Sequence, residues 1–299
     1  MKNKDLKSEA QEALKDLEPS QGFFVGIDSD GCAFDTMEIK HKECFCPNTI
    51  LYWKLQTISK YAREAWEFVN LYSKSRGVNR FIALVEVIRL LKNRKEVRAR
   101  KIELPDMTSL TEWIKAETKL GNPALQAVAL EKNDPILDLA LLWSKAVNNA
   151  IADMVHDMPP YPGLRESVIK LQDHADIMVV SSTPLQALES EWNENDLARY
   201  TRFIAGQEHG SKKEHIALAA KGKYDDHNIL MVGDAPGDME AAKKNGVLFF
   251  PIIPGEEEKS WDLFLTEGID RFLKGKYAGA YEKKLIARFD KSLPDKPPW

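Results

Sequence analysis

The chain has 299 residues, 43% of them hydrophobic and 29% charged, with a formal net charge of -4. This composition provides for a substantial packed core and argues against a disordered chain or a broadly cationic, nucleic-acid-binding surface. The length fits one large domain or two ordinary ones, and we expect two.

Cysteine content and apolar runs bear on the cellular compartment. Residues 1–20 lack the apolar centre of a signal peptide, and no later run is long and uncharged enough to predict a membrane span. Cys32, Cys44 and Cys46 are odd in number, which indicates free thiols in a reducing compartment. A zinc site with His41 is disfavoured because Cys-x-Cys lacks the usual two-residue gap. We therefore predict a cytoplasmic protein.

The first chemical signal is an apolar run at residues 23–27 that ends in Asp28, Asp30 and Gly31. Such a run is typical of a parallel strand buried on both faces. Parallel sheets place ligand sites beyond the carboxyl ends of their strands, so we expect both acids at a functional edge.

The two segments on either side of this strand are predicted to be helical. Residues 1–21 have apolar side chains at helical spacing and are expected to form a helix that packs on the core. Residues 41–157 lack a strand pattern and are divided by glycine and proline into successive helices. Within this insert, Asp134 should cap one helix and Thr108 or Ser109 another.

From residue 161 onward the pattern alternates between strands and helices. Alternation of this kind predicts a parallel, doubly wound α/β sheet with the strand at 23–27 as a central member. The predicted Rossmann-like core comprises residues 22–40 and 158–299, including a C-terminal helical extension, and the all-helical domain comprises residues 41–157. The later strands are expected at 177–180, 203–205, 229–232 and 247–252.

Polar residues follow each predicted strand. Taken singly, each of them could be an ordinary turn, capping or solvated residue. Neither a dinucleotide-binding nor a P-loop glycine pattern is present. The polar residues in question are Ser181 and Ser182, Lys212 with Lys213 as the competing lysine, and Asp234 with Asp238.

Taken together and in order, these residues resemble the four motifs of the haloacid dehalogenase superfamily of phosphohydrolases. The resemblance covers about residues 22–36 and 160–253, and the helical insert resembles the cap domain of that family. Cys32 departs from the family, in which threonine is common at a position that does no chemistry. The matching motifs are Asp28-Ser29-Asp30-Gly31, the apolar run into Ser181, Lys212 before a helix, and Gly233-Asp234-x-x-x-Asp238.

The resemblance implies a role for each core residue. Asp28 would be the nucleophile that forms an aspartyl phosphate, and Asp30 the general acid and base. Ser181 would hydrogen-bond a phosphoryl oxygen, and Lys212 would offset negative charge in the transition state. Lys213 remains the alternative to Lys212.

A magnesium ion is expected among the acids. Carboxylates cannot share a site with a phosphate dianion unless a cation lies between them, and hard oxygen ligands favour Mg²⁺. By resemblance the ligands would be Asp28, Asp234, the backbone carbonyl of Asp30, and Asp238 directly or through water.

Substrate recognition is expected to involve the helical insert. A cap that closes over a site excludes water and selects small substrates. Arg76, Asn79 and Arg80 lie at a helix break, where Arg76 or Arg80 could bind a second anionic group of the substrate. Asn79 and Ser182 are further candidate substrate-binding residues. The alternative for the arginines is a solvated turn.

These residues predict a magnesium-dependent phosphatase of a small phosphorylated metabolite, such as a sugar phosphate or a phosphoglycolate-like acid. Asp30 favours phosphoryl transfer over carbon–halogen cleavage, because the dehalogenase branch has no acid there. The alternatives are a phosphomutase, a phosphonatase, or a non-catalytic regulatory or binding protein on the same fold. We expect no nucleic-acid or membrane partner, and a monomer or homodimer.

Overall fold

The computed structural model describes residues 2–299, which form two compact units. The core unit comprises the chain up to Thr36 and Asp157–Ser292, and the helical unit comprises Met37–His156 and Leu293–Trp299. The chain therefore enters the helical unit four residues earlier than the sequence predicted, and its last seven residues join the helical unit.

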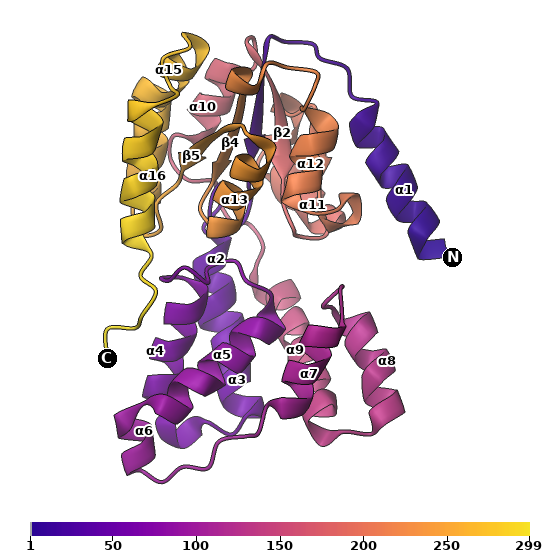
Figure 1. Ribbon diagram of the computed structural model, residues 1–299, viewed down its shortest axis with the longest axis vertical. Coiled ribbons are helices and arrows are strands. Elements are labelled where there is room, and N and C mark those ends of the chain that lie inside the picture. Colours follow the sequence, from indigo (N-terminus) through magenta and orange to yellow (C-terminus); the bar gives the residue numbers. More distant parts are fainter. Residues whose placement is uncertain (1) are drawn as a thin grey trace. The chain divides into compact units, whose positions relative to one another are not determined.

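The core unit is built on a five-stranded parallel sheet with the strand order β3-β2-β1-β4-β5 (Figure 1). Strand β1 is central, with Phe23 opposite Ala175 on one neighbour and Phe24 opposite Ile229 on the other. The predicted doubly wound α/β fold is confirmed. The strands are β1 Phe23–Ile27, β2 Ala175–Val180, β3 Phe203–Ala205, β4 Ile229–Gly233 and β5 Leu248–Pro251.

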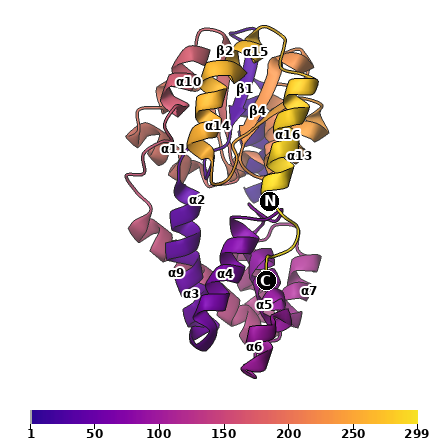
Figure 2. The same cartoon turned by 90° about the vertical axis from the view of Figure 1, so that its left-hand side faces the viewer.

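Helices cover both faces of this sheet (Figure 2). Val25 and Ile27 contribute to a continuous apolar core shared with α10, α11 and α14. Gly26 points to the opposite face, where a Cβ atom would lie 3.0 Å from a methyl group of Val180. The helices are α10 Leu164–Leu171, α11 Leu185–Glu194, α12 Lys212–Ala219, α13 Pro236–Asn245, α14 Glu257–Leu263, α15 Ile269–Leu273 and α16 Ala280–Ser292.

The N-terminal helix α1, Lys2–Lys15, packs against α12 and the preceding turn Gln207–His209. Its Gln11 side chain donates to the backbone carbonyl of His209 at 3.2 Å. The Lys223 ammonium donates to the carbonyls of Leu14, Lys15 and Leu17, which are left unpaired where the helix ends.

The helical unit has an aromatic core. Trp66 and Trp143 are fully buried with ring centroids 6.1 Å apart, and Phe81 contacts Trp143 at 6.1 Å. No helix within residues 2–299 is long and apolar enough to span a bilayer. The elements are α2 Thr36–Ile39, a π-helix Lys40–Phe45, α3 Cys46–Tyr52, a 3-10 helix Gln56–Ile58, α4 Ser59–Asn70, α5 Arg80–Asn93, α6 Lys95–Ala99, α7 Thr108–Ala116, α8 Asn122–Lys132 and α9 Pro135–Met154.

Two predicted helix caps have different outcomes. Asp134 caps α9 as expected, because its carboxylate accepts from the backbone N–H groups of Ile136 at 2.8 Å and Leu137 at 3.2 Å. The prediction for α7 is wrong, because Thr108 is already inside the helix and its N–H donates to Asp106 at 3.1 Å.

The last seven residues contact α4, the loop after it, and Arg94 between α5 and α6. Lys74 donates its backbone N–H to the carbonyl of Pro294 at 3.3 Å, and Leu293 is buried. The Trp299 ring lies 4.3 Å from the Arg94 guanidinium and meets Phe68 edge-on at 5.7 Å. These contacts explain why this segment belongs to the helical unit.

Two histidines are buried beside the start of α12. His209 accepts a hydrogen bond from the Gly206 N–H at 3.2 Å, and its ring lies 6.3 Å from that of His215. His215 is fully buried, and neither of its ring nitrogens has a hydrogen-bond partner among the described residues. Burial, with a smaller contribution from His209, lowers the pKa of His215 from 6.5 to about 4.

We predict that His215 makes the core unit sensitive to acid. The unfolded chain binds a proton near pH 6.5 and the folded chain only near pH 4, so stability is complete above pH 6.5 and falls as pH decreases to about 4. The loss across this window should be about 3 kcal/mol. Urea unfolding measured at several pH values would check it. His215→Leu should flatten the dependence, and the exposed His174→Leu should not.

Candidate active site

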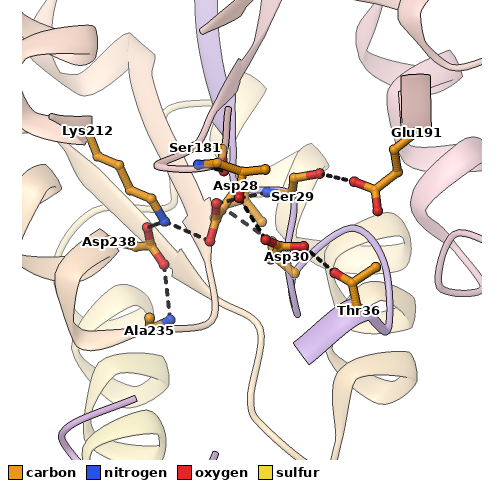
Figure 3. A network of polar contacts seen from close by, with 12 residues as sticks. Asp28, Ser29, Asp30, Thr36, Ser181, Glu191, Lys212, Ala235 and Asp238 are labelled. Atoms are coloured by element: carbon orange, nitrogen blue, oxygen red, sulfur yellow. Dashed lines mark hydrogen bonds and ion pairs between the residues drawn. The ribbon is translucent and has the colours of Figure 1, made fainter. Parts of the chain in front are cut away.

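The functional side chains meet where three neighbouring strands end (Figure 3). Asp28 follows β1, Ser181 follows β2, and Asp234 follows β4. Because β2, β1 and β4 are adjacent and parallel, their carboxyl ends lie at one edge of the sheet. The helices α12 and α13 add Lys212 and Asp238 from their first turns.

Lys212 links two of the acids. Its ammonium lies 2.7 Å from Asp28 Oδ2 and 2.6 Å from Asp238 Oδ1. The second oxygen of Asp238 accepts from the backbone N–H of Ala235 at 3.0 Å. The Lys213 side chain is exposed. The structure thus brings Lys212, and not its neighbour, to the acids.

Gly233 allows Asp238 to approach the strand end. A Cβ atom at Gly233 would lie 2.5 Å from the Cβ and Cγ of Asp238, which is closer than such atoms come. Glycine is therefore required at the position before Asp234 for the carboxylate of Asp238 to reach Lys212.

Burial and neighbouring charges set the protonation of the linked pair. Burial raises the pKa of Asp28 well above its ordinary value, and Asp238 and Asp234 add to the rise while Lys212 opposes it. Burial lowers the pKa of Lys212, but the negative charges of Asp238 and Asp28 raise it by more. The pKa of the ammonium therefore lies above its usual range. Lys212 is therefore charged. Its single positive charge does not balance the three carboxylates of Asp28, Asp234 and Asp238.

The donor set fits a hard divalent cation. Asp28, Asp234 and Asp238 are all buried, and each offers a carboxylate oxygen within 4.8 Å of the others. Three buried carboxylates around one point repel one another strongly unless a cation lies among them, and oxygen-only ligands suit Mg²⁺. The side chain of Asp30 lies outside this cluster, so its predicted part as a ligand through the backbone carbonyl stays a prediction.

Two threonines hold the carboxylate of Asp30. Thr36 donates to Oδ1, and Thr183 donates to Oδ2 at 2.7 Å. Thr183 is not among the residues predicted from the sequence. It follows Ser181 and Ser182 directly, in the polar run after β2. Because Thr183 reaches across from the neighbouring strand, it fixes the direction of the second acid.

The two serines after β2 differ in exposure. Ser181 is buried, and its Oγ accepts from the backbone N–H of Thr183 at 3.2 Å. Its own N–H donates to the carbonyl of Ala205 on β3 at 3.0 Å. Ser182 is exposed. The geometry therefore favours Ser181 over Ser182 as the phosphate-binding serine.

The three predicted residues of the helical unit all have internal contacts. Asn79 caps α5 through the Phe81 N–H at 3.0 Å. Arg80 lies 4.9 Å from the Phe45 ring and donates to Asn148 at 2.6 Å, and burial lowers its pKa to about 10. Arg76 is buried and donates to the Leu71 carbonyl at 3.0 Å. The arginines do not form a solvated turn, and their role in substrate binding stays a prediction. 

Comparison with known proteins gives one family match. Residues 118–252 match the model described as haloacid dehalogenase-like hydrolase. This range contains Ser181, Lys212, Asp234 and Asp238, and Asp28 and Asp30 precede it. No curated protein matches the chain in sequence.

Several solved structures are similar to this structure at low sequence identity. A haloacid dehalogenase-like family protein from Streptococcus pneumoniae is 11% identical, with 80% of this chain and 90% of that one covered and a TM-score of 0.43. A haloacid dehalogenase-like family hydrolase from Xanthomonas campestris is 14% identical, with 91% and 97% covered and a TM-score of 0.42. CbbY from Rhodobacter sphaeroides, solved in complex with phosphate, is 13% identical, with 75% and 83% covered and a TM-score of 0.41.

The sequence match agrees with the order of the motifs. Asp28, Ser181, Lys212, Asp234 and Asp238 follow one another along the chain in the family order, and the fold places them at one edge of a parallel sheet. The chain is therefore similar to the haloacid dehalogenase-like hydrolases, whose family model matches its residues 118–252.

Proposed function

We propose that the protein is a magnesium-dependent phosphatase that hydrolyses a small phosphate monoester through an aspartyl phosphate on Asp28. The observation that carries the proposal is the buried Asp28 carboxylate, which Lys212 contacts at 2.7 Å beside Asp234 and Asp238. A carboxylate held in this way can attack phosphorus once the charge around it is balanced.

The first step would transfer the phosphoryl group to the protein. An Asp28 oxygen forms a bond to phosphorus while the ester P–O bond breaks and its electron pair leaves with the alcohol oxygen. Asp30, oriented by Thr36 and Thr183, gives that oxygen its proton. Lys212 and the Ser181 hydroxyl are the donors that would offset charge on the phosphoryl oxygens.

The second step would release inorganic phosphate. Asp30 takes a proton from water, the water oxygen bonds to phosphorus, and the bond from Asp28 breaks to regenerate its carboxylate. Magnesium, held by Asp28, Asp234 and Asp238, would supply positive charge that lowers the repulsion between carboxylates and phosphate.

The similarity to this family, and the helical unit inserted between the first and second motifs, support a small substrate. Caps of this kind exclude water and macromolecules, which supports a sugar phosphate or a phosphoglycolate-like acid as substrate. We further propose a cytoplasmic monomer or homodimer without nucleic-acid or membrane partners. The three free, buried cysteines support a reducing compartment.

We predict that Asp28→Asn abolishes phosphate release. An amide is too weak a nucleophile to form the acyl phosphate, so kcat should fall by roughly 10³-fold or more. The measurement is phosphate released from a panel of sugar phosphates and small phosphorylated acids with Mg²⁺ present. The exposed Asp173→Asn is the matched control and should keep wild-type activity. Full activity of folded Asp28→Asn protein would refute the proposed nucleophile.

We predict that the site binds magnesium in the resting protein. Mg²⁺ should raise the melting temperature, because a ligand that binds only the folded state at roughly a hundred times its dissociation constant stabilises it by about 2.7 kcal/mol. Chelation with EDTA should reverse the shift and stop phosphate release. Asp234→Asn removes one ligand and should weaken the shift, whereas Asp173→Asn should keep it. An equal shift in both variants would place the ion elsewhere.

A further inference from the structure

Ser29 lies between Asp28 and Asp30, and both its backbone N–H and its carbonyl form hydrogen bonds within the loop that carries these acids. Its N–H donates to Asp28 Oδ1 at 2.8 Å. Its carbonyl accepts from the backbone N–H groups of Cys32, Ala33 and Phe34 at 3.2, 2.8 and 3.2 Å. The loop that carries Asp28 and Asp30 is therefore folded around this one peptide.

The Ser29 hydroxyl joins this loop to helix α11. Trp192 Nε1 donates to Ser29 Oγ at 2.9 Å. Ser29 Oγ in turn donates to Glu191 Oε2 at 2.8 Å (Figure 3). An indole N–H can only donate and an ionised carboxylate can only accept, so the hydroxyl has a single orientation. Both Ser29 and Trp192 are fully buried.

We propose that Glu191 and Trp192 are positioning residues that act through Ser29 to hold the Asp28 and Asp30 carboxylates in their working directions. This inference rests on the proposed phosphatase function and assigns residues that its chemistry does not use. Displacement of a reacting group by about 1 Å can cost roughly 100-fold in rate, so a fixed loop has a direct catalytic value.

Helix α11 connects the Ser29 contact to the loop after β2. The helix begins at Leu185, directly after the loop that presents Ser181 and Thr183. Thr183 already binds Asp30 from that loop at 2.7 Å, and Glu191 binds Ser29 from the helix that follows. The loop after β1 is thus held at two points, at Asp30 by Thr183 from the loop after β2 and at Ser29 by Glu191 from α11.

The charge of Glu191 argues against a role in packing alone. The site already holds Asp28, Asp234 and Asp238 and would receive an anionic substrate, so another carboxylate nearby is electrostatically unfavourable. An apolar residue at position 29 would need neither a carboxylate nor an indole donor. What the acid does provide is a strong, directional acceptor for the Ser29 hydroxyl.

The test compares this pair with a matched serine–glutamate pair on the same helix. Ser29→Ala and Glu191→Ala should each lower kcat by roughly 10- to 100-fold with little change in KM, as for other residues that orient catalytic groups. The double variant should be no worse than either single one, because one shared contact is lost. Glu191→Gln keeps an acceptor oxygen and should recover most of the rate. Ser190→Ala and Glu194→Ala, which break an exposed pair at 2.7 Å, should match wild type.

A second readout does not depend on turnover. Mg²⁺ with beryllium fluoride mimics the aspartyl phosphate and should raise the melting temperature of wild type, Glu191→Gln and Glu194→Ala protein. The rise should be smaller in Ser29→Ala and Glu191→Ala. If wild type is active and these two variants match it in kcat and in this shift, the positioning proposal is wrong. If wild type shows neither turnover nor a shift, the proposed function fails, and the inference with it. Should Ser29→Ala not fold, Glu191→Ala and Glu191→Gln decide the matter.

Discussion

The ion pair network of Lys212 with Asp28 and Asp238 is the constraint on which the rest of the site depends. Three carboxylates are buried at one edge of the sheet, and their mutual repulsion in this environment would favour protonation or unfolding. One ammonium, contacting Asp28 at 2.7 Å and Asp238 at 2.6 Å, offsets part of that charge. The negative charge that Lys212 leaves unbalanced makes the site suited to a divalent cation, which could in turn bind an anionic substrate.

The fold brings these groups together by strand order and not by sequence proximity. Along the chain, Met37–His156 of the helical unit and the strands β2 and β3 lie between β1 and β4, yet these two strands are paired, with Ile27 opposite Val232. The Asp28 N–H then donates to the Val232 carbonyl at 3.0 Å, one residue before Gly233. Register in the sheet thus sets the spacing of the two acids, and the missing Cβ of Gly233 lets Asp238 complete the set.

The sequence predicts the sheet and the acids because each strand is a short apolar run that ends in a distinct polar residue. The strand at 203–205 is predicted at its observed bounds, and the other strands agree to within two residues. Thr183 and Glu191 could not be identified in this way. Their contacts depend on the path of a loop and the face of a helix, and no local pattern encodes either.

Contacts that no local pattern encodes also explain the differences at the start of α7 and at residues 293–299. The cap of α7 was predicted from Thr108 and Ser109, which are good capping types, but the backbone puts Asp106 in reach of the Thr108 N–H. Residues 293–299 join the helical unit through Trp299 stacked on Arg94, a contact between positions about two hundred residues apart in sequence. Long-range packing of this kind overrides the local pattern.

In the loop that carries Asp28 and Asp30, most polar side chains already form hydrogen bonds. One residue separates Asp28 from Asp30, so any movement of the Ser29 peptide displaces both carboxylates together. Every hydrogen-bonding group of Ser29 is engaged, and both oxygens of the Asp30 carboxylate accept from threonines. If this site binds a phosphoryl group as proposed, few of its side chains remain to contact the rest of a substrate. For the proposed phosphatase, discrimination among phosphate monoesters would then come from residues outside these motifs, and the helical unit is the largest part of the chain that the proposed chemistry of Asp28 does not use.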